Sequence, residues 1–198
     1  MLMPLSTEAV QSFRGYAARL DRALQAADWL AVEALAQAIL EAWTSGRRLF
    51  ICGNGGSAAN ALHLANDLHY GIGAGRRPGL RVQALSANVS VVTCLANDLG
   101  YDEVFSRQLA VDGCAGDILL VLSGSGNSPN VLKAIEQART MGIKSFGILG
   151  FSGGKAKDLV DIPIHFAVDD MQVSEDAQMA VGHMIMQWLS RQAAWAQT

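Results

Sequence analysis

From Arg48 onward the chain alternates short apolar runs with helical stretches, and no other feature of the sequence limits its fold so strongly. Each apolar run is bounded by Gly or Ser and has the length of a buried strand. The five runs are residues 49–53, 80–86, 117–123, 145–151 and 162–168. The helical stretches between them are 57–70, about 88–110 and 128–141, with room for about one helical turn between 151 and 162. Strands that alternate with helices form βαβ units with right-handed crossovers, so the sequence predicts an α/β fold with a five-stranded parallel sheet.

Helices are also expected at both ends of this α/β core. Residues 6–45 carry two successive helical patterns, and the second stops at Gly46. A Met-rich amphipathic helix is predicted from Ser174 to about Ala194. The two N-terminal helices are more apolar than a solvent-facing cover needs. The simplest expectation is that they cover a sheet edge, and they are also candidates for packing against another subunit.

Length and composition fit one globular domain. Of the 198 residues, 51% are hydrophobic and 17% are charged, which is enough to bury a core. We predict a single domain over 1–198, with N-terminal helices at 1–46 and the α/β core and last helix at 47–198. A formal net charge of -3 gives no basic surface for direct contact with duplex nucleic acid. Three scattered cysteines, no signal-peptide pattern and no long apolar run predict a cytoplasmic protein without a membrane span.

Two loops rich in Gly and Ser each join a predicted strand to a predicted helix. The first is GNGGSAA at 53–59, and the second is SGSGNS at 123–128. In an open parallel sheet, ligands bind beyond the carboxyl ends of the strands. Glycine lets backbone N–H groups approach an anion, and serine hydroxyls add hydrogen bonds to phosphate oxygens. Tight turns with capping serines would explain either loop alone, but the two together predict a phosphate-ester site.

Two nucleotide-binding motifs fit these loops less well. The pattern Gly53-x-Gly55-x-x-Ala58 is similar to a dinucleotide fingerprint. A dinucleotide site also wants an acidic residue at the end of the second strand, and the run at 80–86 has none. A Walker A loop needs Gly-Lys-Ser or Gly-Lys-Thr, which is absent from both loops.

The motifs CGNGGSAANALH at 52–63 and LSGSGNSPNVL at 122–132 resemble the sugar isomerase (SIS) domain family, and within it the phosphoheptose isomerase group. The segment LANDLGYDEVFSRQL at 95–109 resembles the part of that group between its two loops. The likeness covers essentially the whole chain. It implies a single SIS domain, a flavodoxin-like three-layer sandwich with an N-terminal helical extension, and a homotetramer whose active sites borrow residues across subunits.

The same resemblance assigns substrate contacts to both loops and to the segment between them. The serines of the loops would hold the phosphate, while Asn97 and Asp98 would contact the sugar. The implied substrate-binding residues are Asn54, Gly55, Gly56, Ser57, Asp67, Asn97, Asp98, Ser123, Gly124, Ser125, Ser128 and Glu175.

Four ionisable residues on two predicted helices align with the metal and catalytic positions of the family. His63 and Asp67 are four residues apart, so they share one helix face. Glu175 and His183 are separated by roughly 12 Å along the last helix, and both could reach a metal or substrate midway. The implied metal ligands are His63, Asp67, Glu175 and His183, a nitrogen and oxygen set suited to zinc or a similar divalent cation. Asp67 replaces the Glu of the group and Glu175 replaces its Gln, so the set is more anionic.

The implied activity is aldose–ketose isomerisation, which moves a proton between C1 and C2 through an enediol or enediolate. His183 would act as the base, and Asp67 as the complementary acid, assisted or replaced by a bound metal. The expected reaction converts D-sedoheptulose 7-phosphate to D-glycero-D-manno-heptose 7-phosphate, a precursor of surface polysaccharides such as lipopolysaccharide. Two alternatives stay open. One is a non-catalytic sugar-phosphate sensor, or a tetramer that docks a protein partner like the related protein DiaA, and the other is an isomerase of a different phosphosugar.

Overall fold

The computed structural model describes residues 7–73 and 78–195, so both ends of the predicted domain, residues 1 and 198, lie outside the described ranges. Its centre is one sheet of five parallel strands in the order β2-β1-β3-β4-β5. The strands are β1 (Arg48–Cys52), β2 (Arg81–Ala84), β3 (Ile118–Ser123), β4 (Lys144–Leu149) and β5 (Ile162–His165). This order is that of the flavodoxin-like doubly wound sheets, and each strand overlaps one of the five predicted runs. The predicted α/β fold is confirmed.

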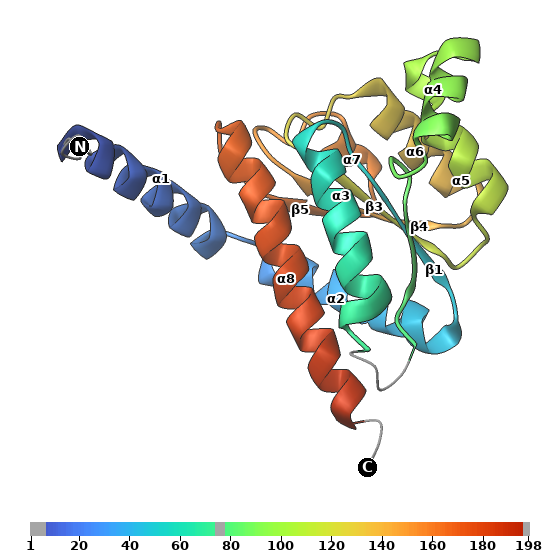
Figure 1. Cartoon of the computed structure of the whole chain (residues 1–198), viewed down its shortest axis with the longest axis horizontal. Coiled ribbons are helices and arrows are strands. Elements are labelled where there is room, and N and C mark those ends of the chain that lie inside the picture. Colours follow the sequence, from blue (N-terminus) through green and yellow to red (C-terminus); the bar gives the residue numbers. More distant parts are fainter. Residues whose placement is uncertain (1–6, 74–77, 196–198) are drawn as a thin grey trace, which may run out of the picture.

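Helices cover both faces of the sheet (Figure 1). One hydrophobic cluster joins α2, α3 and α8 to one face, and a second joins α5, α6 and α7 to the other. The helices are α1 (Thr7–Gln25), α2 (Trp29–Ser45), α3 (Gly56–Asn66), α4 (Val89–Asp98), α5 (Ser106–Asp112), α6 (Pro129–Thr140), α7 (Ala156–Leu159) and α8 (Met171–Trp195). A π-helical turn, η1 (Asp67–Gly71), follows α3, and a 3₁₀ turn, η2 (Tyr101–Glu103), follows α4.

Alternate residues of the central strands pack into opposite clusters. In β1, Leu49 and Ile51 belong to the cluster beneath α2, α3 and α8, whereas Phe50 and Cys52 belong to the cluster beneath α5 to α7. Side chains of a strand alternate between the two faces of a sheet, so a strand covered on both faces must be apolar at every position. This burial explains why the sequence shows continuous apolar runs rather than an alternating pattern.

The expectation of one helix over 88–110 is wrong. The structure has α4, then η2, then α5 in this range. The break follows Gly100, whose φ of 102° lies in a region that other residues rarely adopt, so the helix cannot continue through it. The last helix also begins at Met171, three residues before the predicted Ser174.

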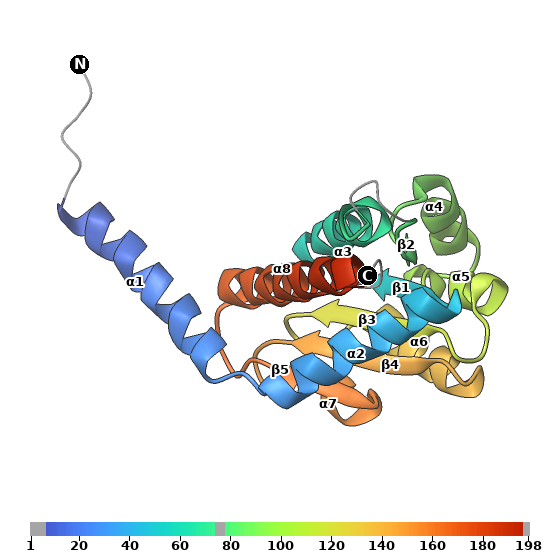
Figure 2. The same ribbon diagram turned by 90° about the horizontal axis from the view of Figure 1, so that it is seen from below.

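Helix α1 extends away from the rest of the molecule (Figure 2). None of its 19 residues, all of them described, is buried. Arg19 Nε donates to Asp170 Oδ2 at 3.1 Å and the Tyr16 hydroxyl donates to Asp176, so α1 is anchored to the start of α8.

Within residues 7–73 and 78–195, no single helix is both long and apolar enough to cross a membrane. Helices α1 and α2 taken together have the length and composition of a membrane span, but the chain bends by 75° between them.

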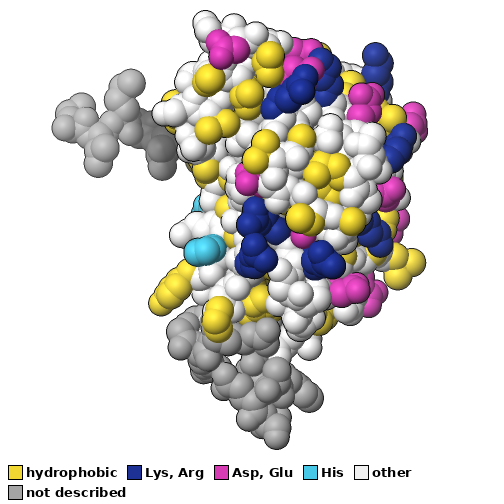
Figure 3. All heavy atoms as spheres, turned by 90° about the vertical axis from the view of Figure 1, so that its right-hand side faces the viewer, with side chains coloured by type: hydrophobic (Ala, Val, Ile, Leu, Met, Phe, Trp, Pro, Cys, Tyr) yellow, Lys and Arg dark blue, Asp and Glu magenta, His cyan; other side chains and the backbone are white. Residues whose placement is uncertain are grey.

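The side of the molecule that carries α4 and α5 has a mixed surface. In Figure 3, Lys and Arg side chains on this side are interspersed with Asp and Glu, and hydrophobic side chains are scattered between them. One such pairing of opposite charges is that of Lys133 of α6 with Asp102 and Glu103 of η2, the second at 2.8 Å. Basic side chains there are therefore partly neutralised by acidic neighbours.

Candidate active site

The two predicted loops lie next to each other at the carboxyl edge of the sheet. The first loop joins β1 to α3 and the second joins β3 to α6, and β1 and β3 are neighbouring strands. A Cβ at Gly53 would lie 2.7 Å from the carbonyl oxygen of Leu122 and 2.8 Å from Cβ of Ser57. Only glycine therefore lets the first loop lie this close to the end of β3.

The serines of the second loop divide into two kinds. Ser123 is buried, and its Oγ accepts a hydrogen bond from Gly126 N at 3.0 Å, so it shapes the loop. Ser125 and Ser128 are half-buried, and Ser125 Oγ accepts a longer hydrogen bond from Asn127 N at 3.3 Å. Ser128 precedes α6, yet its hydroxyl makes no capping hydrogen bond within the described structure. The hydroxyls of Ser125 and Ser128 are therefore better placed than that of Ser123 to bind a phosphate.

A third loop, residues 150–155 after β4, packs against the second loop. Its part in the site was not predicted from the sequence. Lys155 N donates to Asn127 Oδ1 at 3.1 Å, and Ala156 N donates to the carbonyl oxygen of Gly126 at 2.9 Å. A Cβ at Gly126 would lie 1.9 Å from the carbonyl oxygen of Gly153. The adjacent glycines Gly153 and Gly154, both with positive φ, are the sequence signal that could have revealed it.

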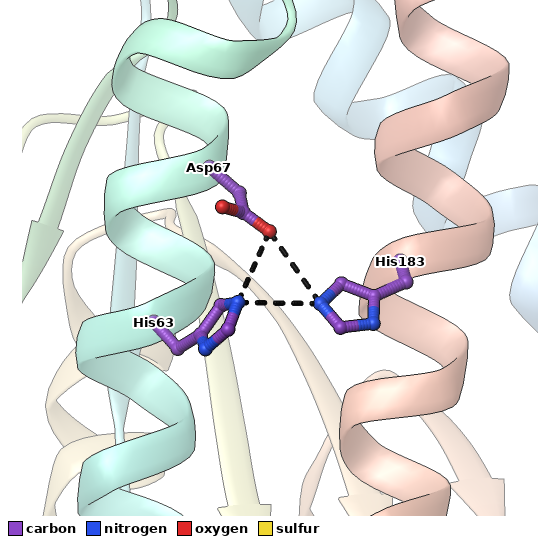
Figure 4. Close-up of side chains that lie close together, drawn as sticks. All are labelled: His63, Asp67 and His183. Carbon is purple, nitrogen blue, oxygen red and sulfur yellow. Dashed lines mark hydrogen bonds and ion pairs between the residues drawn. The ribbon is translucent and has the colours of Figure 1, made fainter.

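Three ionisable side chains converge at the other end of α3, where α3 and α8 lie side by side (Figure 4). The Nε2 atoms of His63 and His183 are 3.3 Å apart. Asp67 Oδ2 lies 3.4 Å from Nε2 of His63 and 3.5 Å from Nε2 of His183. The two imidazoles expose about half of their side-chain area, 54% and 46%, and Asp67 exposes 20%. The structure therefore brings together three of the four residues in the predicted metal set.

These three atoms have the spacing that a tetrahedral metal needs. Donors about 2.0–2.1 Å from a tetrahedral zinc lie about 3.3–3.4 Å from one another. The separations between Nε2 of His63, Nε2 of His183 and Oδ2 of Asp67 are 3.3, 3.4 and 3.5 Å, so they describe one face of such a tetrahedron. Among the described residues, no fourth His, Cys, Asp or Glu joins this group. Three protein ligands with one open position are typical of catalytic zinc sites.

Glu175, the fourth member of the predicted metal set, lies apart from this group. Its carboxylate occupies the space beside Gly56, because a Cβ at Gly56 would lie only 2.4 Å from it. Gly56 precedes His63 by two helical turns, about 10 Å along α3. A Cβ at Gly182 would lie 2.1 Å from the side chain of Leu64, so α8 packs closely on α3 at this point. This contact places His183, the neighbour of Gly182, beside His63, whereas Glu175 lies about two helical turns away along α8. Glu175 therefore belongs with the first loop rather than with the two histidines.

Asp67 is positioned by a feature that sequence does not reveal. The α-helical pattern ends at Asn66, and Asp67 begins the π-helical turn η1, in which Ile72 N donates to the carbonyl oxygen of Asp67 at 3.2 Å. Such turns insert one extra residue into a helix and are frequent at functional sites. Asp67 still follows His63 at the predicted spacing of four residues.

Asn97 and Asp98 end α4, in the segment between the two loops. Both are exposed, and Asn97 Nδ2 donates to Asp98 Oδ1 at 2.8 Å. The thiol of Cys94 donates to Asp98 Oδ2 at 3.4 Å, and this bond is the main reason that the pKa of Cys94 is raised. Asp98 is thus held by its neighbours on α4, and its role toward a sugar is a prediction.

Cys52 ends β1, directly before the first loop, but it is not a nucleophile. It is fully buried, and burial raises the pKa of its thiol to about 12. The thiol therefore stays protonated at neutral pH, and only the thiolate is strongly nucleophilic. Cys52 therefore has a structural role at the end of β1.

The fold, the two adjacent loops and the group of ionisable side chains together define a domain that binds sugar phosphates. Comparison with known proteins supports this class. Residues 12–150 match the model of the SIS domain, so the chain belongs to the SIS domain family. The chain is 40% identical over 185 residues to the phosphoheptose isomerase of Chlorobaculum parvum, covering 91% of this chain and 88% of that protein.

Two solved structures have the same fold over nearly their whole length. The phosphoheptose isomerase of Francisella tularensis superposes with a TM-score of 0.86 at 26% identity, covering 93% of this chain and 97% of that one. The phosphoheptose isomerase of Neisseria gonorrhoeae gives a TM-score of 0.84 at 26% identity, with coverage of 92% and 96%. The resemblance inferred from the two loop motifs is therefore confirmed.

Proposed function

We propose that this chain is an enzyme that converts D-sedoheptulose 7-phosphate to D-glycero-D-manno-heptose 7-phosphate. The observation that carries the proposal is the convergence of three side chains. His63 comes from α3, the helix that begins at the first loop, Asp67 from the turn that follows it, and His183 from α8. The 40% identity with a phosphoheptose isomerase over 91% of the chain supports it. The cytoplasmic location and the use of the product in surface polysaccharides stay predictions.

The reaction needs a grip on the remote phosphate and a proton shuttle at C1 and C2. The two loops would hold the phosphate, and that hold would align the other end of the sugar chain beside the histidines. In the ketose-to-aldose direction a base takes a proton from C1, and a proton returns at C2. The C2 carbonyl oxygen gains a proton, and the C1 hydroxyl loses one. We assign the base to His183 and the oxygen-to-oxygen proton transfer to Asp67.

The same three side chains fit a divalent cation. His63, Asp67 and His183 would hold it, and it would supply Lewis-acid polarisation of the substrate carbonyl. One atom cannot serve twice, because an Nε2 that binds a metal has no lone pair left to accept a proton. With metal bound, Nε2 of His183 is therefore a ligand, and without metal it is free to act as the base.

The test of the proposed activity is incubation with a panel of ketose phosphates, with and without chelator, followed by identification of the products. We expect isomerisation of the seven-carbon ketose phosphate. Tight binding of the same compound without any turnover would overturn the catalytic proposal and favour a sugar-phosphate sensor.

The phosphate grip gives a separate prediction. Replacing Ser125 and Ser128 together by Ala should weaken binding of sedoheptulose 7-phosphate by about 10- to 100-fold, because two hydrogen bonds to a charged group are lost. Isothermal calorimetry measures the change. Thr140→Ala is the matched control, since it removes an exposed hydroxyl at the opposite end of α6 and should leave the affinity unchanged. Equal affinity of the double variant and the wild type would show that these two serines do not bind the phosphate.

We also predict a homotetramer. Phe13 of α1 is 67% exposed and Leu30 of α2 is 77% exposed. An apolar groove between α2 and α8 is lined by Trp29, Val32, Met184 and Trp188. Surfaces of this kind are buried in closed symmetric oligomers. Light scattering at micromolar concentration should give the mass of four chains, and a monodisperse monomer would contradict the prediction.

A further inference from the structure

Three segments with predicted substrate contacts meet at the side chain of Asn54. Asn54 lies in the first loop, and its Nδ2 donates to Oδ1 of Asn130 at 2.9 Å. Asn130 lies in the first turn of α6, directly after the second loop, and its Nδ2 donates back to Oδ1 of Asn54 at 2.9 Å. The hydroxyl of Tyr101, in η2 after α4, donates to the same Oδ1 at 3.0 Å. Asn54 thus links both loops and the segment between them.

The orientation of this amide pair is set by its other donors. Oδ1 of Asn54 accepts from Asn130 and from Tyr101, while Oδ1 of Asn130 accepts from Asn54 and from Val131 N at 3.0 Å. Turning either amide over would place donor against donor and acceptor against acceptor. Asn130 is 1% exposed, so water cannot replace a lost bond there without cost.

The segment that carries Tyr101 is fixed against α6 a second time. Lys133, one helical turn after Asn130, pairs with Asp102 and Glu103 of η2. The hydroxyl of Tyr101 therefore reaches Asn54 from a segment that is already held in place, although the ring of Tyr101 is 56% exposed. The two loops, which follow the paired strands β1 and β3, are thus also joined by a polar contact between their side chains.

We propose that Asn130 and Tyr101 are positioning residues for substrate binding. Through the amide of Asn54 they set the distance between the first and second loops, so that both loops can contact one phosphorylated sugar. The side chain of Asn54 then serves the loop geometry, while Gly55 and Gly56 present backbone to the ligand. This inference rests on the proposed function and extends it to residues outside both loops.

The test is a kinetic comparison of Asn130→Asp, Tyr101→Phe and the wild type with sedoheptulose 7-phosphate. Asn130→Asp keeps the size of the side chain but sets a second acceptor against Oδ1 of Asn54. It should raise KM by about 10- to 100-fold with a smaller change in kcat. Tyr101→Phe removes one hydroxyl from an exposed ring, so it should fold normally and raise KM by about 3- to 10-fold. Because both act on one amide, the two effects should not be additive in the double variant.

The matched control is Ser145→Ala. Ser145 is also buried, and its hydroxyl bonds to Asp161 at the opposite, amino end of β4. It should lower the melting temperature without changing KM, which separates loss of stability from loss of positioning. If Asn130→Asp does not fold, Tyr101→Phe provides the same test.

An unchanged KM in every folded variant would overturn the positioning role. If the wild type turns over no ketose phosphate, the proposed function fails first. The positioning role is then measured by calorimetry with inorganic phosphate, where a weaker affinity in the variants supports it and an equal affinity overturns it.

Discussion

His183→Ala should lower kcat/KM for sedoheptulose 7-phosphate by about 10²- to 10⁴-fold, the range that a positioned acid or base contributes. The imidazole of His183 is the ionisable group that α8 places level with His63 and Asp67, with Nε2 at 3.3 and 3.5 Å from them. Its side chain is 46% exposed, so its removal leaves no buried cavity and the melting temperature should change little. Steady-state kinetics and a thermal melt of the same preparation separate the two effects.

His69→Ala is the matched control for this loss. His69 is an exposed histidine of η1, two residues after Asp67, but it does not belong to the converging group. Its variant should keep kcat/KM within about twofold of the wild type, as exposed substitutions away from a site usually do. Full turnover in His183→Ala would contradict both roles of this imidazole, that of the base in a metal-free enzyme and that of a required ligand in a metal-bound one.

Most of the fold could be predicted because its determinants are local. Buried parallel strands must be apolar on both faces, so β1 and β3 read as short continuous apolar runs between glycines and serines. The break between α4 and α5 could not be predicted from hydrophobic spacing, since residues on both sides of Gly100 keep a helical pattern. A glycine inside such a pattern is often tolerated, and only its φ of 102° shows that the chain turns there.

The candidate site could be predicted only as far as each helix by itself determines it. His63 and Asp67 share one helix, so their spacing alone places them together. Whether Glu175 or His183 completes the group depends on the height at which α8 packs against α3. That height follows from the close contact of Gly182 with Leu64, two residues far apart in the sequence. Asn130 was missed for the same reason, because its partner Asn54 lies 76 residues away.

His63→Ala should lose the bound divalent metal. The imidazole supplies one of three ligand atoms that are 3.3–3.5 Å apart, and two ligands bind zinc far more weakly than three. Elemental analysis of protein purified without chelator should give about one metal per site for the wild type and close to none for this variant. Glu175→Gln is the matched control, because the carboxylate of Glu175 lies beside Gly56 and outside the group. A loss of metal in Glu175→Gln equal to that in His63→Ala would restore the four-ligand set expected from sequence.

Removal of the metal from the wild type decides which role Nε2 of His183 has in turnover. If the metal is required, chelation should abolish isomerase activity and added zinc should restore it, and His63→Ala should be as inactive as the chelated enzyme. Full activity in a preparation that elemental analysis shows to be metal-free would contradict this. Nε2 of His183 would then be free to take the proton from C1, with Asp67 moving the proton between the two oxygens. In that case His63→Ala should keep most of its turnover, whereas His183→Ala should not, because only the second variant removes the base.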